Sequence, residues 1–214
     1  MQPTPTITYL FDPLCGWCYG AAPMLERLAA DGDLAIEVLP TGLFAGEGAR
    51  PMDSGFAAFA WSNDERIARL TGQIFSEAYR RHVLEKPGTR FDSGPATLAL
   101  TAVALIAPDR QLEALRAIQA ARYVDGRDIT DFAVLGEILR ALSLLEAAER
   151  LQKQDDALVV AGKSHIQKVQ TEMRSFGVTG VPRLIAGIGE TRRPVPGAAL
   201  FGDAEALIAL LKAA

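Results

Sequence analysis

The sequence predicts an α/β protein whose mixed β-sheet is interrupted by an all-helical insertion. Three observations lead to this prediction. A strand, a helix and a second strand follow one another within residues 6–39, which is the pattern of a parallel βαβ unit. Helical periodicity then continues for about a hundred residues. Two short strand patterns and a last helix close the chain, so the sheet takes its strands from both ends of the sequence.

The first unit is the clearest. Residues 6–11 (TITYLF) are rich in β-branched and aromatic side chains, and Asp12-Pro13 ends the strand. Residues 19–30 place apolar side chains at helical spacing, with charged ones toward solvent. Residues 34–39 form a second apolar strand that stops before Pro40. These three elements predict two parallel strands joined by a right-handed helical crossover.

The middle of the chain is predicted to be helical. After a glycine-rich loop, Ser62 and Glu65 stand three residues apart as in a capping box, which predicts a helix over 64–84. Further helices are predicted over 95–107, 109–123 and 130–142, with shorter ones within 144–175. We therefore predict an inserted helical domain at residues 51–160, flanked by residues 1–50 and 161–214 of the other domain.

The end of the chain returns to strand character. Residues 183–187 form a short apolar strand, residues 191–196 could form its hairpin partner, and residues 204–212 form a last helix. This order of elements is that of a thioredoxin-like core split by a helical domain.

Composition narrows the functions that fit. The 214 residues are 49% hydrophobic and 22% charged, which is typical of a globular chain that buries a core without disulfides. With 22 basic and 26 acidic residues, the net charge of -4 argues against a nucleic-acid partner. The longest uncharged stretch, residues 93–108, is too short to cross a bilayer. The N-terminus lacks the pattern of a secretory signal, so we expect a cytoplasmic protein without a membrane partner.

The chain has two cysteines, and both lie in the segment Cys15-Gly16-Trp17-Cys18. This spacing beside a strand–helix unit indicates a redox dithiol. A zinc site would need about four ligands, and His82 and His165 are distant, so we expect no metal. A structural disulfide would close a very small loop and constrain little. Two inert buried thiols remain the third alternative.

The position of the pair gives each cysteine a predicted role. Cys15 falls at the start of the predicted helix, where unpaired N–H groups and the helix dipole stabilise an anion. The thiolate is the form that attacks disulfides. Cys15 is therefore predicted to be an exposed nucleophile. Cys18 lies one turn further along the same face and is predicted to be the buried thiol that resolves a mixed disulfide.

Two separated motifs resemble a known family. The sequence Cys-x-Trp-Cys-Tyr-Gly follows a strand ending in Asp-Pro, and Gly-Val-x-Gly-Val-Pro occurs at residues 177–182. Together they resemble the DsbA-type thiol–disulfide oxidoreductases, and more narrowly their cytoplasmic branch, described as predicted protein-disulfide isomerases. Residues 119–129 (QAARYVDGRDI) are similar to a stretch of that branch's helical domain.

The resemblance implies a sheet of four or five strands with catalytic Cys15 and Cys18 at the start of the first helix. It also implies a cis Val181–Pro182 peptide that faces the dithiol. That turn would present its backbone to an extended peptide or to glutathione. An ordinary turn proline is the alternative. Many periplasmic oxidants of the family have Pro-His between the cysteines, so Gly16-Trp17 argues against a very strong oxidant.

Other candidate residues surround the pair. Asp12 is either a proton acceptor for Cys18 or a turn-forming residue before Pro13. Trp17 is predicted to be exposed and to contact substrate. His82 and His165 are expected on solvated helix faces.

Two other functions stay open. Kappa-type glutathione transferases and 2-hydroxychromene-2-carboxylate isomerases resemble this split plan, but they use a serine near the position of Cys15. A second thiol is superfluous for holding glutathione, so the pair favours dithiol exchange. A non-catalytic peptide-binding module would not need Cys18. The expected partners are protein or small-molecule thiols and disulfides, with no resident cofactor and glutathione as a candidate co-substrate.

Overall fold

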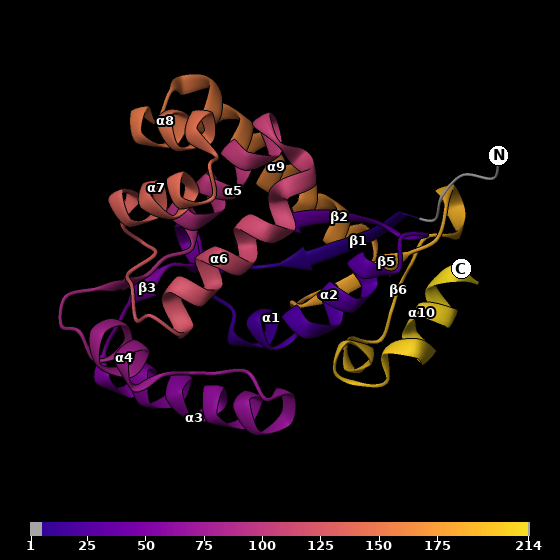
Figure 1. Cartoon of the computed structure of the whole chain (residues 1–214), viewed down its shortest axis with the longest axis horizontal. Coiled ribbons are helices and arrows are strands. Elements are labelled where there is room, and N and C mark those ends of the chain that lie inside the picture. The colour runs from indigo at the N-terminus through magenta and orange to yellow at the C-terminus, as the bar shows by residue number, and fades with distance from the viewer. Residues whose placement is uncertain (1–5, 214) are drawn as a thin grey trace.

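The computed structural model describes residues 6–213 and contains the mixed sheet that the sequence predicts (Figure 1). Its four strands run in the order β2-β1-β5-β6. The central strand β1 (Thr6–Phe11) pairs in parallel with β2 (Ala35–Pro40) and antiparallel with β5 (Arg183–Ala186). The short β6 (Arg193–Pro194) pairs antiparallel with β5. The predicted βαβ unit and C-terminal hairpin are both confirmed.

Helices cover both faces of this sheet. Alternate residues of β1 point to opposite faces: Tyr9 and Phe11 join the main core, whereas Leu10 packs in a smaller cluster with Val169 and Met173. Those two belong to the long helix α9 (Asp156–Ser175). The main core includes residues of α1 (Gly16–Gly20), α2 (Ala22–Ala30) and α10 (Ala204–Lys212), together with residues of the helices between β2 and β5.

The helical insertion predicted between the two halves of the sheet is confirmed (Figure 1). It contains α3 (Ser54–Thr71), α4 (Glu77–Tyr79), α5 (Gly94–Ile106), α6 (Gln111–Tyr123), α7 (Phe132–Ala141) and α8 (Leu145–Lys153). A π-helical turn, Arg80–Leu84, continues α4. The domain boundaries at residues 51 and 160 stay a prediction, because α9 runs through residue 160 without a break.

The structure corrects the first helix of the insertion. The predicted capping box is wrong, because Ser62 lies in mid-helix and α3 begins eight residues earlier, at Ser54. Asp53 is the N-cap residue and accepts a hydrogen bond of 2.8 Å from the amide of Phe56. The helix predicted over 64–84 is also divided, because Gly72 adopts a left-handed conformation (φ 75°) that ends α3. The small sheet formed by β3 (Arg50–Pro51) and β4 (Arg90–Phe91) was not predicted.

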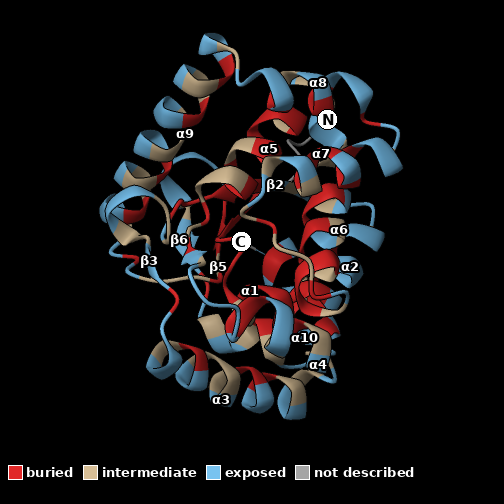
Figure 2. Ribbon diagram, turned by 90° about the vertical axis from the view of Figure 1, so that its left-hand side faces the viewer, coloured by how far each residue is buried: buried red, intermediate tan, exposed pale blue. Residues whose placement is uncertain are grey.

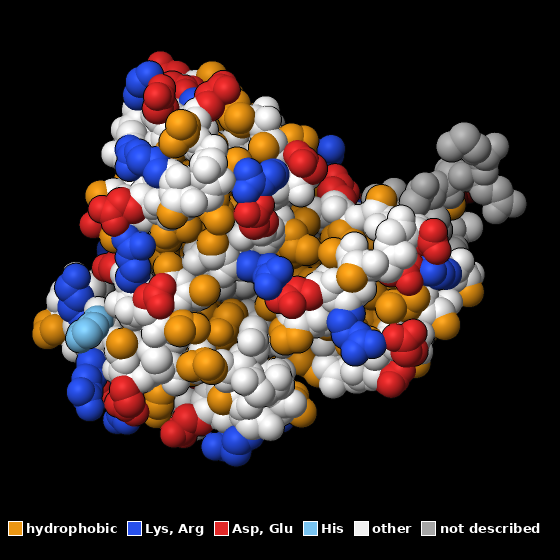
Figure 3. Space-filling model, viewed as in Figure 1, with side chains coloured by type: hydrophobic (Ala, Val, Ile, Leu, Met, Phe, Trp, Pro, Cys, Tyr) orange, Lys and Arg blue, Asp and Glu red, His pale blue; other side chains and the backbone are white. Residues whose placement is uncertain are grey.

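Buried residues concentrate in the sheet and on the inner sides of α1, α5 and α6, whereas α3 and α9 alternate between buried and exposed positions (Figure 2). Basic and acidic side chains are interspersed over the face drawn in Figure 3. Across the described residues, none of the helices combines the length and apolarity of a bilayer span. Three buried charged residues, Asp12, Asp64 and Arg122, lie in the part of the core that adjoins the cysteines.

Candidate active site

The loop after β1 delivers the two cysteines to the start of α1. Cys15 is the N-cap residue of this helix, with extended backbone angles (φ -81°, ψ 115°). Its amide donates a hydrogen bond of 3.0 Å to the carbonyl oxygen of Asp12, and its carbonyl oxygen accepts one of 3.1 Å from Tyr19. Both cysteines are free thiols. Cys18 lies one turn into the helix, as the sequence predicts.

The prediction that Cys15 is exposed is wrong. Only 8% of the residue is accessible, because the Val181–Pro182 turn and the insertion cover it. Its Sγ–H points toward the carbonyl oxygen of Val181 at 3.8 Å, although the two residues are 166 positions apart in the chain. The peptide bond between Val181 and Pro182 is cis and faces the dithiol, as the family resemblance implied. A reactant would therefore reach Cys15 through a pocket rather than on an open surface.

That pocket has a volume of about 340 Å³ and contains Cys15 in its wall. Most of its lining is apolar, from Trp17, Phe44, Phe56, Phe59, Ile67 and Phe91. Trp17 is half-buried rather than exposed, because its ring packs edge-on against Phe201, with 5.3 Å between centroids. The guanidinium of Arg66 lies 5.7 Å from the same ring. Trp17 thus lies in the wall of the pocket that contains Cys15, and its contact with substrate stays a prediction.

Asp12 is fully buried, and the structure brings it close to Cys18. The carboxylate accepts three hydrogen bonds: from Ser93 Oγ at 2.7 Å, from the Leu14 amide at 2.9 Å and from the Phe44 amide at 3.1 Å. Burial raises the pKa of Asp12, although these hydrogen bonds oppose the rise. The bond to Leu14 shows that Asp12 forms the predicted turn, and a role as proton acceptor for Cys18 stays a prediction.

The environment of Cys18 disfavours its thiolate. Burial raises the pKa of Cys18 well above its ordinary value, and its hydrogen bond with the Cys15 thiol and the charges of Cys15 and Asp12 add to the rise. The hydroxyl of Tyr9, from β1, donates a hydrogen bond of 3.3 Å to the carbonyl oxygen of Cys18. Cys18 must therefore lose its proton to a neighbouring base before it can attack a disulfide.

A second buried polar cluster was missed by sequence reasoning. Asp64 of α3 is 5% exposed, and its Oδ2 accepts a hydrogen bond of 2.9 Å from the hydroxyl of Tyr79. The guanidinium of Arg122, which is fully buried, lies over the rings of Tyr79 and Tyr123 at 5.3 and 5.6 Å. Tyr123 in turn donates to the Leu14 carbonyl oxygen at 2.8 Å. Two residues of this cluster, Arg122 and Tyr123, belong to residues 119–129. The resemblance of that stretch to the family was the one feature of the sequence that could have pointed to the cluster.

The two histidines do not join the cysteines. His82 is exposed, as expected, but His165 is half-buried, and burial lowers its pKa. The expectation of a solvated face is therefore wrong for His165, because α9 packs this side chain toward β2, near Glu37. Within residues 6–213, no three side chains of the metal-binding types converge.

Comparisons with known proteins agree with this arrangement. The family model described as a DSBA-like thioredoxin domain matches residues 6–205. The cytosolic disulfide reductase DsbM from Pseudomonas aeruginosa is 30% identical over 97% of both chains, with a TM-score of 0.85. Its structure with GSH covers 97% of this chain and 98% of that chain, also at 30% identity, and matches with a TM-score of 0.82.

Two further structures share the architecture. A predicted protein disulfide isomerase from Nitrosomonas europaea is 26% identical over 99% of this chain and 97% of its own, with a TM-score of 0.81. A 2-hydroxychromene-2-carboxylate isomerase, 17% identical over 96% and 95% of the two chains, shares the fold with a TM-score of 0.64. No curated protein matches the sequence. Because the family model covers both halves of the sheet and the insertion, the chain belongs to the DSBA-like thioredoxin-domain family of thiol–disulfide oxidoreductases.

Proposed function

We propose that the protein is a cytosolic disulfide reductase that works through a mixed disulfide on Cys15 and draws its electrons from glutathione. The observation that carries the proposal is the asymmetry of the two thiols. Cys15 is in the wall of an apolar pocket and faces the Val181 carbonyl oxygen, whereas Cys18 is 1% exposed beneath it. The Cys15 thiol can therefore contact a substrate in the pocket, whereas the Cys18 thiol can react only with Cys15.

In the proposed reaction the Cys15 thiolate attacks one sulfur of a substrate disulfide. The substrate S–S bond breaks, its electron pair leaves with the second sulfur as a thiolate, and a Cys15–substrate disulfide forms. Cys18 then gives its proton to a base and attacks Cys15 Sγ, which releases the rest of the substrate. Asp12 is the proposed base, since its buried carboxylate has a raised pKa and acts on Cys18. The Cys15–Cys18 dithiol is thereby oxidised to a disulfide, and the two electrons that it gives up reduce the substrate disulfide to two thiols.

Glutathione would restore the dithiol. Two glutathione thiols reduce the Cys15–Cys18 disulfide and leave as oxidised glutathione, so the cycle balances with one substrate disulfide consumed. The relative DsbM has been solved with GSH, which supports glutathione as the reducing thiol. The Val181 carbonyl oxygen beside Cys15 is the proposed backbone acceptor for a peptide amide of substrate or glutathione. Trp17 and Pro182 are proposed to flank the bound chain.

The test is turnover of a small alkyl disulfide with glutathione as reductant. We expect Cys15→Ser to abolish turnover and Cys18→Ser to stop reduction through the intramolecular disulfide. Wild-type turnover in the Cys15→Ser variant would contradict the proposal. Conjugation of glutathione to an electrophile that proceeds equally in wild type and Cys18→Ser, without disulfide reduction in either, would instead favour the transferase or isomerase alternative.

A further inference from the structure

Asp64 is an acid at a position where its helix would ordinarily bury an apolar residue. On α3 it shares the buried face with Ala57 and Ile67, while its neighbour Glu65 points to solvent. An ionisable group in such a place costs free energy unless it is neutral or compensated. Its two oxygens have different surroundings, and the difference suggests why an acid is present.

The two carboxyl oxygens of Asp64 differ in their hydrogen bonding. Oδ2 accepts the hydrogen bond from the Tyr79 hydroxyl. Oδ1 lies against the backbone of Gly16, so close that a Cβ added to Gly16 would overlap it. Among residues 6–213 no donor forms a hydrogen bond to Oδ1. Asp64 and Gly16 both line the pocket that contains Cys15, so this free oxygen lies in the wall beside the residue that follows the nucleophile.

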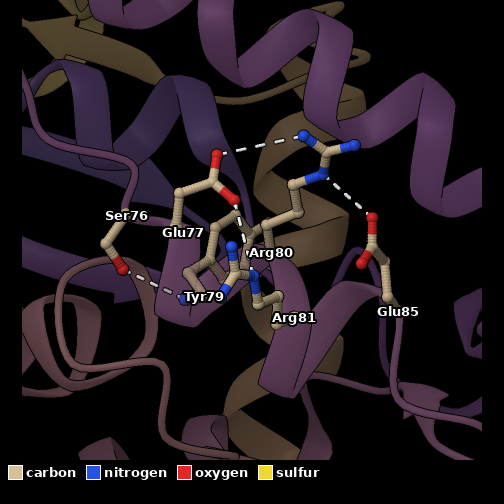
Figure 4. Close-up of polar contacts among 6 residues, drawn as sticks. All are labelled: Ser76, Glu77, Tyr79, Arg80, Arg81 and Glu85. Carbon is tan, nitrogen blue, oxygen red and sulfur yellow. Dashed lines mark hydrogen bonds and ion pairs between the residues drawn. The ribbon is translucent and has the colours of Figure 1, made fainter.

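Tyr79 is itself firmly placed. It ends α4, whose N-cap Ser76 accepts a hydrogen bond of 3.0 Å from the Tyr79 amide (Figure 4). Gly126 (φ 67°) lets the chain pass directly against the backbone of Ala78 and Tyr79, since any Cβ there would overlap it. Surface ion pairs join the charged residues on either side: Arg80 with Glu85 at 2.9 Å, and Arg80 and Arg81 with Glu77 at 3.9 and 3.8 Å. The Tyr79 hydroxyl, which donates to Asp64, is therefore held in place by the contacts of residues 76–85.

The charges around Asp64 suit a group that exchanges protons near neutrality. Burial raises its pKa to about 7, while the Tyr79 hydrogen bond and the buried Arg122 limit the rise. The other ionisable groups in the lining of the same pocket are Cys15 from the start of α1, Tyr123 from α6 and Arg50 from β3. A carboxyl poised between its two forms at working pH can both give and take a proton.

We propose that Asp64 is the proton donor of the pocket, which protonates the substrate thiolate expelled when Cys15 attacks a disulfide. This inference rests on the proposed function and adds a residue of the insertion to its chemistry. In the step, the Cys15 thiolate forms the new S–S bond and the substrate S–S bond breaks. The departing sulfur takes the electron pair, and the proton of the Asp64 carboxyl passes to it. The products are a mixed disulfide, a free thiol and the Asp64 carboxylate.

The test compares two disulfides that differ in their need for a proton. The leaving thiol of oxidised glutathione has an ordinary alkyl pKa of about 8.5, whereas the leaving group of an aryl disulfide such as dithiobis(nitrobenzoate) departs as a stable anion. Stopped-flow rates are measured for the reduced protein with each probe. Asp64→Asn keeps the shape and the acceptor for Tyr79. We expect it to slow attack on oxidised glutathione about 100-fold more than attack on the aryl disulfide.

Two further readings make the result decisive. The measured ratio is the rate of attack on oxidised glutathione divided by the rate of attack on the aryl disulfide. In the wild type this ratio should fall as pH rises through 7, because Asp64 loses its proton there. In Asp64→Asn the ratio should not depend on pH. The exposed Glu65→Gln is the matched control and should keep the wild-type ratio. An equal loss with both probes, or an unchanged ratio, would overturn the inference. Cys15→Ser separates the two proposals: if it abolishes both reactions while Asp64→Asn changes no ratio, the proposed function stands and the role of Asp64 fails.

Discussion

The Tyr123 hydroxyl donates a hydrogen bond of 2.8 Å to the carbonyl oxygen of Leu14, the residue immediately before the candidate nucleophile Cys15. Tyr123 ends α6 of the insertion and is 1% exposed. Its own carbonyl oxygen accepts a hydrogen bond of 2.9 Å from the amide of Ser76, in the segment that leads to Tyr79. The insertion therefore does more than cover the sheet, since one residue, Tyr123, connects the cysteine loop to α6 through its side chain and to the start of α4 through its backbone.

Removing that hydroxyl should destabilise the protein. Tyr123→Phe leaves the Leu14 carbonyl oxygen buried without this donor, which costs about 1–3 kcal/mol of unfolding free energy. Urea denaturation measures the loss. Tyr19→Phe is the matched control, because its hydroxyl bonds the Ile74 carbonyl oxygen at 3.2 Å in a partly buried place, and it should cost less. Equal losses in the two variants would contradict the bracing role of Tyr123.

Gly16 should tolerate no side chain while Asp64 is present. A Cβ at residue 16 overlaps Asp64 Oδ1 and lies 3.2 Å from Ile67 Cδ1. Gly16→Ala is expected to lower the unfolding free energy by about 1–3 kcal/mol, and Asp64→Ala in the same chain should recover part of that loss. Gly202→Ala, whose Cβ would have its nearest neighbour at 3.8 Å, should have a smaller effect. Strict additivity of Gly16→Ala and Asp64→Ala would show that the two sites do not touch.

Asp64 should make stability depend on pH. Its folded pKa of about 7 lies above the ordinary value of 3.8, so the folded protein binds an extra proton between these values. The unfolding free energy must then fall as pH rises through that window, by at most about 4 kcal/mol. Asp64→Asn should reduce this fall, measured by urea denaturation from pH 4 to 8. Asp12 contributes to the slope in both proteins, so the difference between them reports Asp64. Identical slopes would contradict the raised pKa.

Arg122 should hold the pKa of Asp64 down. Its buried positive charge lowers that pKa, so Arg122→Met, which keeps much of the side-chain volume, should raise it by about one unit or more. Carboxyl-carbon NMR titration of Asp64 measures the change directly. Arg116→Met is a suitable control, because Arg116 is half exposed and pairs with Glu26 on the surface at 2.7 Å. A lower Asp64 pKa in Arg122→Met would show that the two residues are not coupled in this way.

The sequence predicts the parts of this site that local pattern determines. The strand 6–11, the cysteine spacing and the helix that follows are each encoded within a few residues, so Cys15 and Cys18 could be placed at once. The exposure of the Cys15 and Trp17 side chains could not be predicted in this way, because it depends on residues far away in the sequence. Cys15 is covered by Val181 from the other end of the chain, and Trp17 by Phe201.

The burial of Asp64 could not be predicted from the local sequence either. In the run Ser-Asn-Asp-Glu it has the sequence pattern of a solvent-exposed helix cap, because nothing local reports that Tyr79 and Arg122 will enclose it. The true cap, Asp53, precedes a stretch whose apolar residues lack clear periodicity, so the sequence pattern does not indicate that a helix begins there. Long-range packing decides the burial of Asp64, and a single sequence carries little of that information.

The attacking sulfur can be identified by mass spectrometry of the two single-cysteine variants after exposure to oxidised glutathione. Cys18→Ser should carry one glutathione on Cys15, while Cys15→Ser should react far more slowly, because Cys18 is buried and its thiol holds its proton. The wild type should end as the Cys15–Cys18 disulfide without an adduct. An adduct that forms on Cys18 as fast as on Cys15 would contradict the division of roles between the two thiols.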